Sequence, residues 1–260
     1  MAFRAIILSD LHLLDPNRDS RYPLFLKALT KVKVDSSISH LILLGDVFDV
    51  LVGNFSFWTE LHADFFKLLK EITASGKKII WVQGNHDFQI KKLVREHNVE
   101  WVEHNEVFTW NGIKVYLSHG DLADWKDKLH PVWRAFLTSR FLGLILFFLP
   151  SFIVKKIFYP LSIKISRGSR KVSLARDRTE KAKHIFRKYA QKCAEKTDSR
   201  IVLLGHSHIA ECEYLKPELL YMNVGSWYSE PQIGLLEIDP TMAPPHFEAK
   251  LSSLASWLSS

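Results

Sequence analysis

Five short clusters of Asp, Asn and His residues could bind metal ions and hydrolyse a phosphate ester. In chain order they are Asp10-Leu11-His12, Gly45-Asp46, Gly84-Asn85-His86-Asp87, Ser118-His119-Gly120-Asp121 and Gly205-His206-Ser207-His208. Carboxylate, amide and imidazole groups suit hard or borderline divalent ions, so Mn is the first expectation and Zn or Fe the next. Two such ions, about 3.5–4 Å apart, generate a hydroxide and neutralise the charge that grows on phosphoryl oxygens. The residue types therefore indicate a two-metal phosphoesterase.

The positions of these clusters explain how they could meet in space. Three of them directly follow apolar, strand-like runs at Ala5–Leu8, Leu41–Leu44 and Ile201–Leu204. In an α/β sheet, residues at the carboxyl ends of neighbouring strands point into one crevice. Asp46 is the candidate bridging ligand, because a carboxylate can bind two ions at once. The other expected ligands are Asp10, His12, Asn85, His119, His206 and His208.

The remaining pattern predicts an α/β fold in one domain, residues 1–260. Short apolar runs predict strands at Phe3–Leu8, His40–Leu44, Lys78–Val82, Ile113–Leu117 and Ile201–Leu204. Helical spacing predicts helices at Tyr22–Val32 and Phe57–Thr73, and a charged helix from Ser173 to about Lys196. After Gly205 further strands are expected at Glu211–Leu215, Leu219–Asn223, Ile233–Ile238 and His246–Leu251. Strands alternating with helices indicate stacked sheets flanked by helices.

Residues 129–170 differ from the rest and predict a helical insertion, or cap. Its apolar run, Phe141–Val154, has Arg140 before it and Lys155-Lys156 after it. A membrane-spanning helix needs about 20 apolar residues, so this shorter, Pro-containing run does not predict a span. Two interpretations remain: a helical hairpin packed as a subdomain, or an interfacial helix pair whose apolar face meets a membrane or an acyl chain. The flanking cations favour the second.

Composition narrows the class of protein. The hydrophobic content of 47% excludes disorder, and the two cysteines, Cys193 and Cys212, predict neither a disulfide framework nor a Cys-based zinc site. The N-terminal apolar run is short and is interrupted by Asp10, which predicts a core strand of a cytoplasmic protein. The net charge of +7 indicates attraction to phosphates, nucleic acid or an acidic membrane surface.

The clusters together resemble the calcineurin-like metallophosphoesterase superfamily, whose pattern is D-x-H, G-D, G-N-H-D, H-G and G-H-x-H. The match runs from Asp10 to His208. The resemblance implies a four-layer sandwich of two mixed β-sheets flanked by helices. It implies that the first ion is held by Asp10, His12, Asp46 and His208, and the second by Asp46, Asn85, His119 and His206. It also implies catalytic roles for His86, facing the scissile phosphate, and for Asp87, orienting the His86 ring.

A narrower resemblance is to the UDP-2,3-diacylglucosamine diphosphatases of lipid A synthesis. It rests on Asp10–Leu13, Gly45–Asp49, Ser118–Asp121, Val224–Tyr228 and the apolar insertion followed by basic residues. That family releases UMP and an acylated glucosamine 1-phosphate at the inner face of the membrane. The resemblance implies a nucleotide-sugar lipid substrate, peripheral membrane association and no nucleic-acid partner. The expected substrate-binding residues are Asp127, Ser166, Ser169, Arg170 and Lys171.

One residue departs from that narrower family. Much of the family carries Arg where this chain has His86. A phosphate monoester leaves without a strong proton donor, whereas a histidine matters more for an alkoxide leaving group. The alternative is therefore a metallophosphodiesterase or phosphatase acting on another nucleotide, nucleic-acid or phosphate-ester substrate. A third hypothesis, a silent binding scaffold, conflicts with the retention of every expected metal ligand.

Overall fold

Two mixed β-sheets form the centre of the fold in the computed structural model, which describes residues 2–123, 135–160, 180–228 and 230–260. One sheet has six strands in the order β13-β12-β1-β2-β4-β6, and the other has five in the order β10-β11-β9-β8-β7. Both sheets contain parallel and antiparallel pairs. The strands of the first sheet are β1 (Phe3–Leu8), β2 (His40–Leu43), β4 (Lys78–Val82), β6 (Glu100–Val102), β12 (Gln232–Ile238) and β13 (Phe247–Ser253). Those of the second are β7 (Asn105–Trp110), β8 (Ile113–Ser118), β9 (Ile201–Leu204), β10 (Glu211–Lys216) and β11 (Leu219–Asn223).

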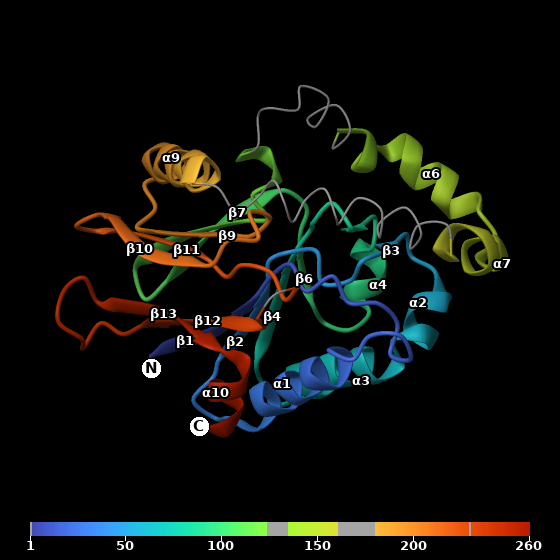
Figure 1. The fold of residues 1–260 in the computed structure, drawn as a ribbon, viewed down its shortest axis with the longest axis horizontal. Coiled ribbons are helices and arrows are strands. Elements are labelled where there is room, and N and C mark those ends of the chain that lie inside the picture. Colours follow the sequence, from blue (N-terminus) through green and yellow to red (C-terminus); the bar gives the residue numbers. More distant parts are fainter. Residues whose placement is uncertain (1, 124–134, 161–179, 229) are drawn as a thin grey trace.

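Helices cover the outer face of each sheet (Figure 1). Helices α1 (Tyr22–Val34), α3 (Ala63–Ala74) and α10 (Leu254–Ser259) lie against the six-stranded sheet, and α9 (Glu180–Thr197) lies against the five-stranded sheet. Buried apolar side chains fill the space between the sheets and the space under each helical layer. The four-layer sandwich expected from the resemblance is confirmed.

The expected strands are confirmed with small changes at their ends, but one helix is divided. The predicted helix Phe57–Thr73 consists of α2 (Ser56–Leu61) and α3, which are separated at His62. The His62 ring is buried between Tyr22 and Phe48, and its Nδ1 lies 3.0 Å from the Tyr22 hydroxyl. This packing holds His62 at φ −113° and ψ 39°, outside helical geometry.

Several short elements were not expected from the sequence. They are β6, β7, the two-residue strands β3 (Leu51–Val52) and β5 (Asp87–Phe88), and α4 (Lys91–Arg95). Strands β3 and β5 pair with each other in parallel, directly after the segments that contain Asp46 and His86. They therefore connect two of the five polar clusters.

The described part of the insertion contains α6 (Arg140–Phe148), α7 (Ser151–Ile153) and the π-helical turn η2 (Val154–Phe158). Figure 1 shows α6 and α7 together at the edge of the molecule, on the side of α2. The α6 helix buries none of its residues, and Phe147 on it is 80% exposed. Val154 and Tyr159, in contrast, are part of the main core. Among the described residues, no helix is both long and apolar enough to cross a membrane.

Candidate metal centre

The polar clusters converge at the carboxyl ends of strands from both sheets. Each expected metal ligand lies in the loop that follows a core strand. Asp10 and His12 follow β1, Asp46 follows β2, Asn85 follows β4, His119 follows β8, and His206 and His208 follow β9. The loops after β1 and β2 run side by side, since the His12 N–H donates to the Asp46 carbonyl at 2.9 Å. The fold therefore brings all seven expected ligand residues together.

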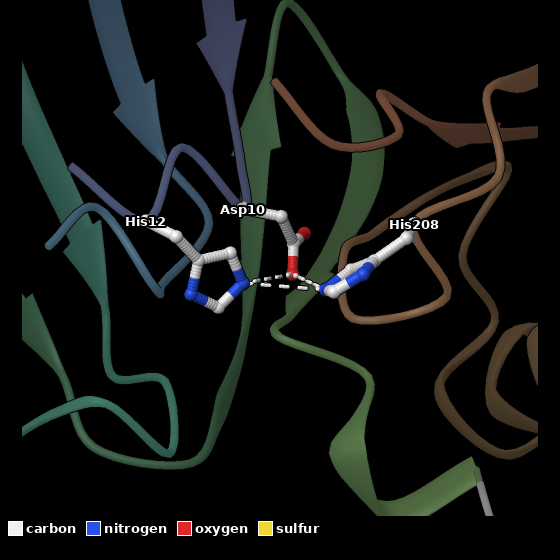
Figure 2. A group of neighbouring side chains, drawn as sticks. All are labelled: Asp10, His12 and His208. Atoms are coloured by element: carbon white, nitrogen blue, oxygen red, sulfur yellow. Dashed lines mark hydrogen bonds and ion pairs between the residues drawn. The ribbon is translucent and has the colours of Figure 1, made fainter. Parts of the chain in front are cut away.

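Asp10, His12 and His208 form a first group, which Figure 2 shows with the three side chains pointing at one another. Oδ1 of Asp10 lies 3.3 Å from Nε2 of His208 and 3.9 Å from Nε2 of His12. The two Nε2 atoms are 3.2 Å apart. Three atoms that can each donate a lone pair thus face one point, as ligands around a cation do.

Asp46, His119 and His206 form a second group beside the first. Oδ2 of Asp46 lies 3.4 Å from Nε2 of His119 and 3.7 Å from Nε2 of His12. One carboxylate oxygen thus approaches a histidine of each group. This is the position that a ligand bridging two ions must occupy.

The hydrogen bonds of His119 test whether the second group fits a metal ion. Nδ1 of His119 lies 2.7 Å from the Leu44 carbonyl oxygen, which can only accept, so Nδ1 carries the proton. When the ring is neutral, as a metal ligand must be, Nε2 presents its lone pair on the side of the Asn85 side-chain oxygen, an acceptor 3.3 Å away. Nδ1 of His206 lies 3.3 Å from the same Nε2. Converging acceptors fit a cation, and the carbonyl behind His119 orients the ring for it.

Burial and charge set the protonation of these groups. Burial holds the pKa of His12 well below its usual value and that of His206 at about 4, so both rings are neutral at pH 7. Burial alone would raise the pKa of Asp10, but the hydrogen bond from His208 and the charge of His119 lower it to about 2. Neutral imidazoles and ionised carboxylates are the forms that bind metal ions.

The backbone of the site adopts an uncommon conformation. Five of the expected ligand residues have φ between 45° and 65°, in the left-handed region: Asp10, His12, Asp46, His206 and His208. Such residues cost of order 1–3 kcal/mol each and cluster at functional sites. Gly45, at φ +84°, also permits close approach, because a Cβ there would lie 2.7 Å from Nδ1 of His119. The loops are thus bent to turn the ligand side chains into the site.

His86 lies next to both groups, but its partner differs from the expected one. Nδ1 of His86 lies 2.7 Å from the carbonyl oxygen of Asp49. The Asp87 carboxylate instead accepts hydrogen bonds from other groups, namely the backbone N–H of Asp46, Val47 and Gly84 and the indole N–H of Trp81. Asp87 therefore holds the loop that carries Asp46, and the Asp49 backbone orients His86.

Sequence reasoning missed further residues that support the site. The Tyr228 ring stacks on His12, with centroids 5.0 Å apart, and the Arg21 guanidinium lies over the same Tyr228 ring at 5.2 Å. Arg21 also donates to the carbonyls of Leu11 and His12. The Asp49 carboxylate lies 4.0 Å from Nδ1 of His12. The available signals were the second Asp of Gly45–Asp49 and the aromatic end of Val224–Tyr228.

The predicted substrate-binding residues fall outside the part of the chain that the structure describes. They are Asp127, Ser166, Ser169, Arg170 and Lys171. They stay predictions, as does the full 129–170 extent of the insertion, of which the structure describes residues 135–160.

Known proteins resemble this chain in sequence over most of its length. The family described as calcineurin-like phosphoesterase matches residues 3–224. The chain is 25% identical over 238 residues to a UDP-2,3-diacylglucosamine hydrolase of Vibrio vulnificus (strain CMCP6), covering 88% of this chain and 91% of the relative. It is 23% identical over 253 residues to the protein of that name from Wigglesworthia glossinidia brevipalpis, covering 97% of each chain. A predicted phosphoesterase structure from Streptococcus pneumoniae TIGR4 superposes with a TM-score of 0.46 at 14% identity, covering 98% of this chain and 91% of that one.

Proposed function

Since the chain belongs to the calcineurin-like phosphoesterase family and is a metal-dependent hydrolase, we propose that its substrate is UDP-2,3-diacylglucosamine. The reaction hydrolyses the pyrophosphate to UMP and 2,3-diacylglucosamine 1-phosphate, in the lipid A pathway. The names of the relatives support this substrate. The observation that carries the proposal is helix α6, whose large apolar side chains are exposed. The segment before this helix is held near His86, because Gln89 donates a hydrogen bond to the carbonyl oxygen of Leu137.

The residues of the site have different proposed roles in this reaction. Asp10, His12, Asp46 and His208 would hold one divalent ion, and Asp46, Asn85, His119 and His206 the other, with Mn proposed for both. When bound, the ions polarise the phosphoryl group and activate water. His86 has Nδ1 engaged by the Asp49 carbonyl, so only Nε2 is available to a phosphoryl oxygen of the substrate. Asp87 keeps the Asp46 loop in place through the backbone N–H bonds that it accepts.

The insertion would bind the acyl chains. Large apolar side chains on α6 and just after it are exposed, among them Phe141 at 65%, Leu144 at 58%, Phe147 at 80% and Phe148 at 77%. Each methylene that such a surface removes from water contributes roughly 0.8 kcal/mol. Two acyl chains could therefore hold a nucleotide lipid firmly while its pyrophosphate lies at the metal centre.

The same face would associate peripherally with the inner surface of the membrane. Arg140 precedes the apolar run, and Lys155 and Lys156 follow it in η2. Cations beside an apolar face suit the headgroup region of an anionic bilayer. A substrate embedded by its acyl chains would then reach the enzyme without leaving the membrane surface.

Product analysis by mass spectrometry tests the proposed reaction. The purified protein is incubated with Mn²⁺ and UDP-2,3-diacylglucosamine, and Asp46→Asn serves as the control. UMP together with the acylated sugar 1-phosphate is the expected result. Cleavage of a generic phosphodiester without cleavage of the lipid would retain the metal centre and reject this substrate.

His86 favours one alternative function, hydrolysis of another phosphate ester. An imidazole beside the metal groups can protonate an alkoxide leaving group, which a pyrophosphatase does not require. If the substrate were a nucleic acid, affinity would fall steeply with salt and would not respond to detergent. A lipid substrate gives the opposite pattern, since its affinity depends on apolar contacts that detergent competes for.

A further inference from the structure

Gln89 connects the loop that carries His86 to the insertion. It lies three residues after His86 and directly follows strand β5. Its side-chain Nε2 donates to the carbonyl oxygen of Leu137 at 3.0 Å and to that of Ser139 at 3.2 Å. Only the nitrogen of the amide can donate to two carbonyls, so this pair of contacts also determines the orientation of the amide.

The contact reaches the first turn of helix α6. Ser139 is the N-cap of α6, and its Oγ accepts from the Leu142 N–H at 3.1 Å. The Leu137 side chain, in the segment that leads into the helix, is 5% exposed. Gln89 therefore binds the insertion at the point where α6 begins.

Gly143 supplies a second and independent observation. A glycine inside a helix costs about 0.5–1 kcal/mol relative to alanine, so the helix itself gives no reason for it. A Cβ at Gly143 would lie 3.2 Å from Oε1 of Gln89. The missing side chain lets α6 approach the Gln89 amide closely.

The C-terminal end of the described insertion is attached to the loop that carries His12. The Tyr159 hydroxyl donates to Oδ2 of Asp15 at 3.1 Å, and the Tyr159 ring packs against Phe57 and Trp58. Asp15 lies three residues after His12. Both ends of α6–η2 are thus connected to loops that carry residues of the metal centre, while the apolar face between them stays exposed.

We propose that Gln89 is a positioning residue. It holds helix α6 at a distance from His86 that lets one phosphate ester with a long apolar tail reach both the metal centre and the apolar face of α6. This inference rests on the proposed function, since it assumes that the apolar face of α6 receives the tail. A small phosphodiester reaches the metal centre without touching α6, so its hydrolysis does not depend on Gln89. The residue therefore selects for tailed substrates without taking part in the chemistry.

Two variants of different chemistry test the proposal. Gln89→Glu keeps the shape of the side chain but places a carboxylate against two carbonyl oxygens. Gly143→Ala adds a methyl group at the contact while improving helix propensity. Gln191→Glu, on α9, is the control with the same change of charge. KM and kcat are measured for UDP-2,3-diacylglucosamine and for bis(p-nitrophenyl) phosphate, together with metal content and Tm.

Both variants are expected to raise KM for the lipid about tenfold, the effect of losing one or two hydrogen bonds. Activity on the small diester, metal content and the Gln191→Glu control should stay unchanged. Gly143→Ala should keep or raise Tm, which separates positioning from a loss of stability. Equal losses on both substrates, or an unchanged KM for the lipid in both variants, would overturn the proposal.

Hydrogen–deuterium exchange separates this inference from the proposed function. If the wild-type protein cleaves the small diester but not the lipid, the proposed substrate is rejected. The Gln89 contact is then judged from the amides of Arg140–Phe148 alone. Faster exchange there in Gln89→Glu than in wild type supports the attachment, and unchanged exchange rejects it.

Discussion

The carbonyl oxygen of Asp49 lies 2.7 Å from Nδ1 of His86, and this contact determines which nitrogen of the ring can act on a substrate. A carbonyl only accepts, so Nδ1 carries a proton and Nε2 is left to contact the phosphate. The same Asp49 has its side chain 4.0 Å from Nδ1 of His12. One residue therefore contacts both a proposed metal ligand, through its side chain, and the proposed catalytic histidine, through its backbone.

His86→Ala should lower kcat about 10²-fold or more, which is the usual contribution of a positioned proton-transferring or charge-stabilising group. Metal content should stay at the wild-type level, because the two proposed ligand sets do not include His86. Steady-state kinetics and elemental analysis measure the two effects. His86→Arg serves as the matched variant, and it should retain more activity on the pyrophosphate than on a phosphodiester. Loss of metal in His86→Ala would instead make His86 a ligand, as its place beside His12 and Asp46 permits.

Asp46→Asn should remove activity and metal together. Oδ2 of Asp46 approaches a histidine of each metal group, and Oδ1 accepts the His86 backbone N–H at 2.9 Å. Loss of this charge weakens the binding of both ions, so kcat should fall below about one hundredth of the wild-type value. Asp198→Asn, at an exposed Asp that pairs with Lys114, is the control and should change neither quantity. A fully metallated and active Asp46→Asn protein would exclude the bridging role.

Most of the candidate metal centre could be predicted because its expected ligands are polar residues placed directly after apolar strands. Asp46 after Leu41–Leu44 and His206 after Ile201–Leu204 carry this signal in their sequence neighbours. The orientation of His86 could not be predicted, because the atom that holds it is a backbone carbonyl and any residue type supplies one. The contact of Gln89 with Ser139 was equally hidden, since it joins segments 50 residues apart.

The elements of the fold could likewise be predicted where the sequence is periodic, and were missed where it is irregular. Strand β9, buried throughout, and strand β1, buried except at Arg4, have apolar runs that predict them directly. Strand β7 was missed because its residues are exposed or only half-buried and its sequence includes Glu106 and Asn105. The break at His62 was missed because it depends on packing against Tyr22, a residue 40 positions earlier in the chain.

Metal binding should release a proton from His119 at neutral pH. Burial opposes a charged ring, but the carboxylates of Asp46, Asp10 and Asp121 outweigh it and raise the pKa of His119 to about 10 in the metal-free protein. A ligand histidine must be neutral, so binding Mn²⁺ at pH 7.5 should expel about one proton. Calorimetric titration in buffers of different ionisation enthalpy measures this release, which should vanish above pH 10. His184→Gln, on the exposed side of α9, is the control that should leave it unchanged.

The same raised pKa predicts how the stability of the metal-free protein depends on pH. The folded state holds the His119 proton more tightly than the unfolded chain, whose pKa is near 6.5. The stabilisation is therefore fully present below pH 6.5 and is lost as pH rises through about 10. Denaturant unfolding of the metal-free protein should show a decrease in the free energy of unfolding over this window. A free energy that rises across this window would contradict the predicted charge of His119.

Exposed phenylalanines on α6 should determine binding to lipid. Phe147 and Phe148 are 80% and 77% exposed, and each would contribute roughly 1.5 kcal/mol or more when transferred from water into a bilayer or an acyl-chain site. Replacing both by Ser should weaken sedimentation with anionic vesicles at least about tenfold per residue and raise KM for the lipid substrate.

Val34→Ser, at an apolar residue of α1 that is 69% exposed, is the matched control and should change neither vesicle binding nor KM for the lipid. Hydrolysis of a small chromogenic diester should stay unchanged, because the proposed metal ligands lie in the strand-end loops and not on α6. Equal losses on the lipid and the small diester would mean that the face maintains the fold, and retained vesicle binding would place the membrane contact elsewhere on the protein.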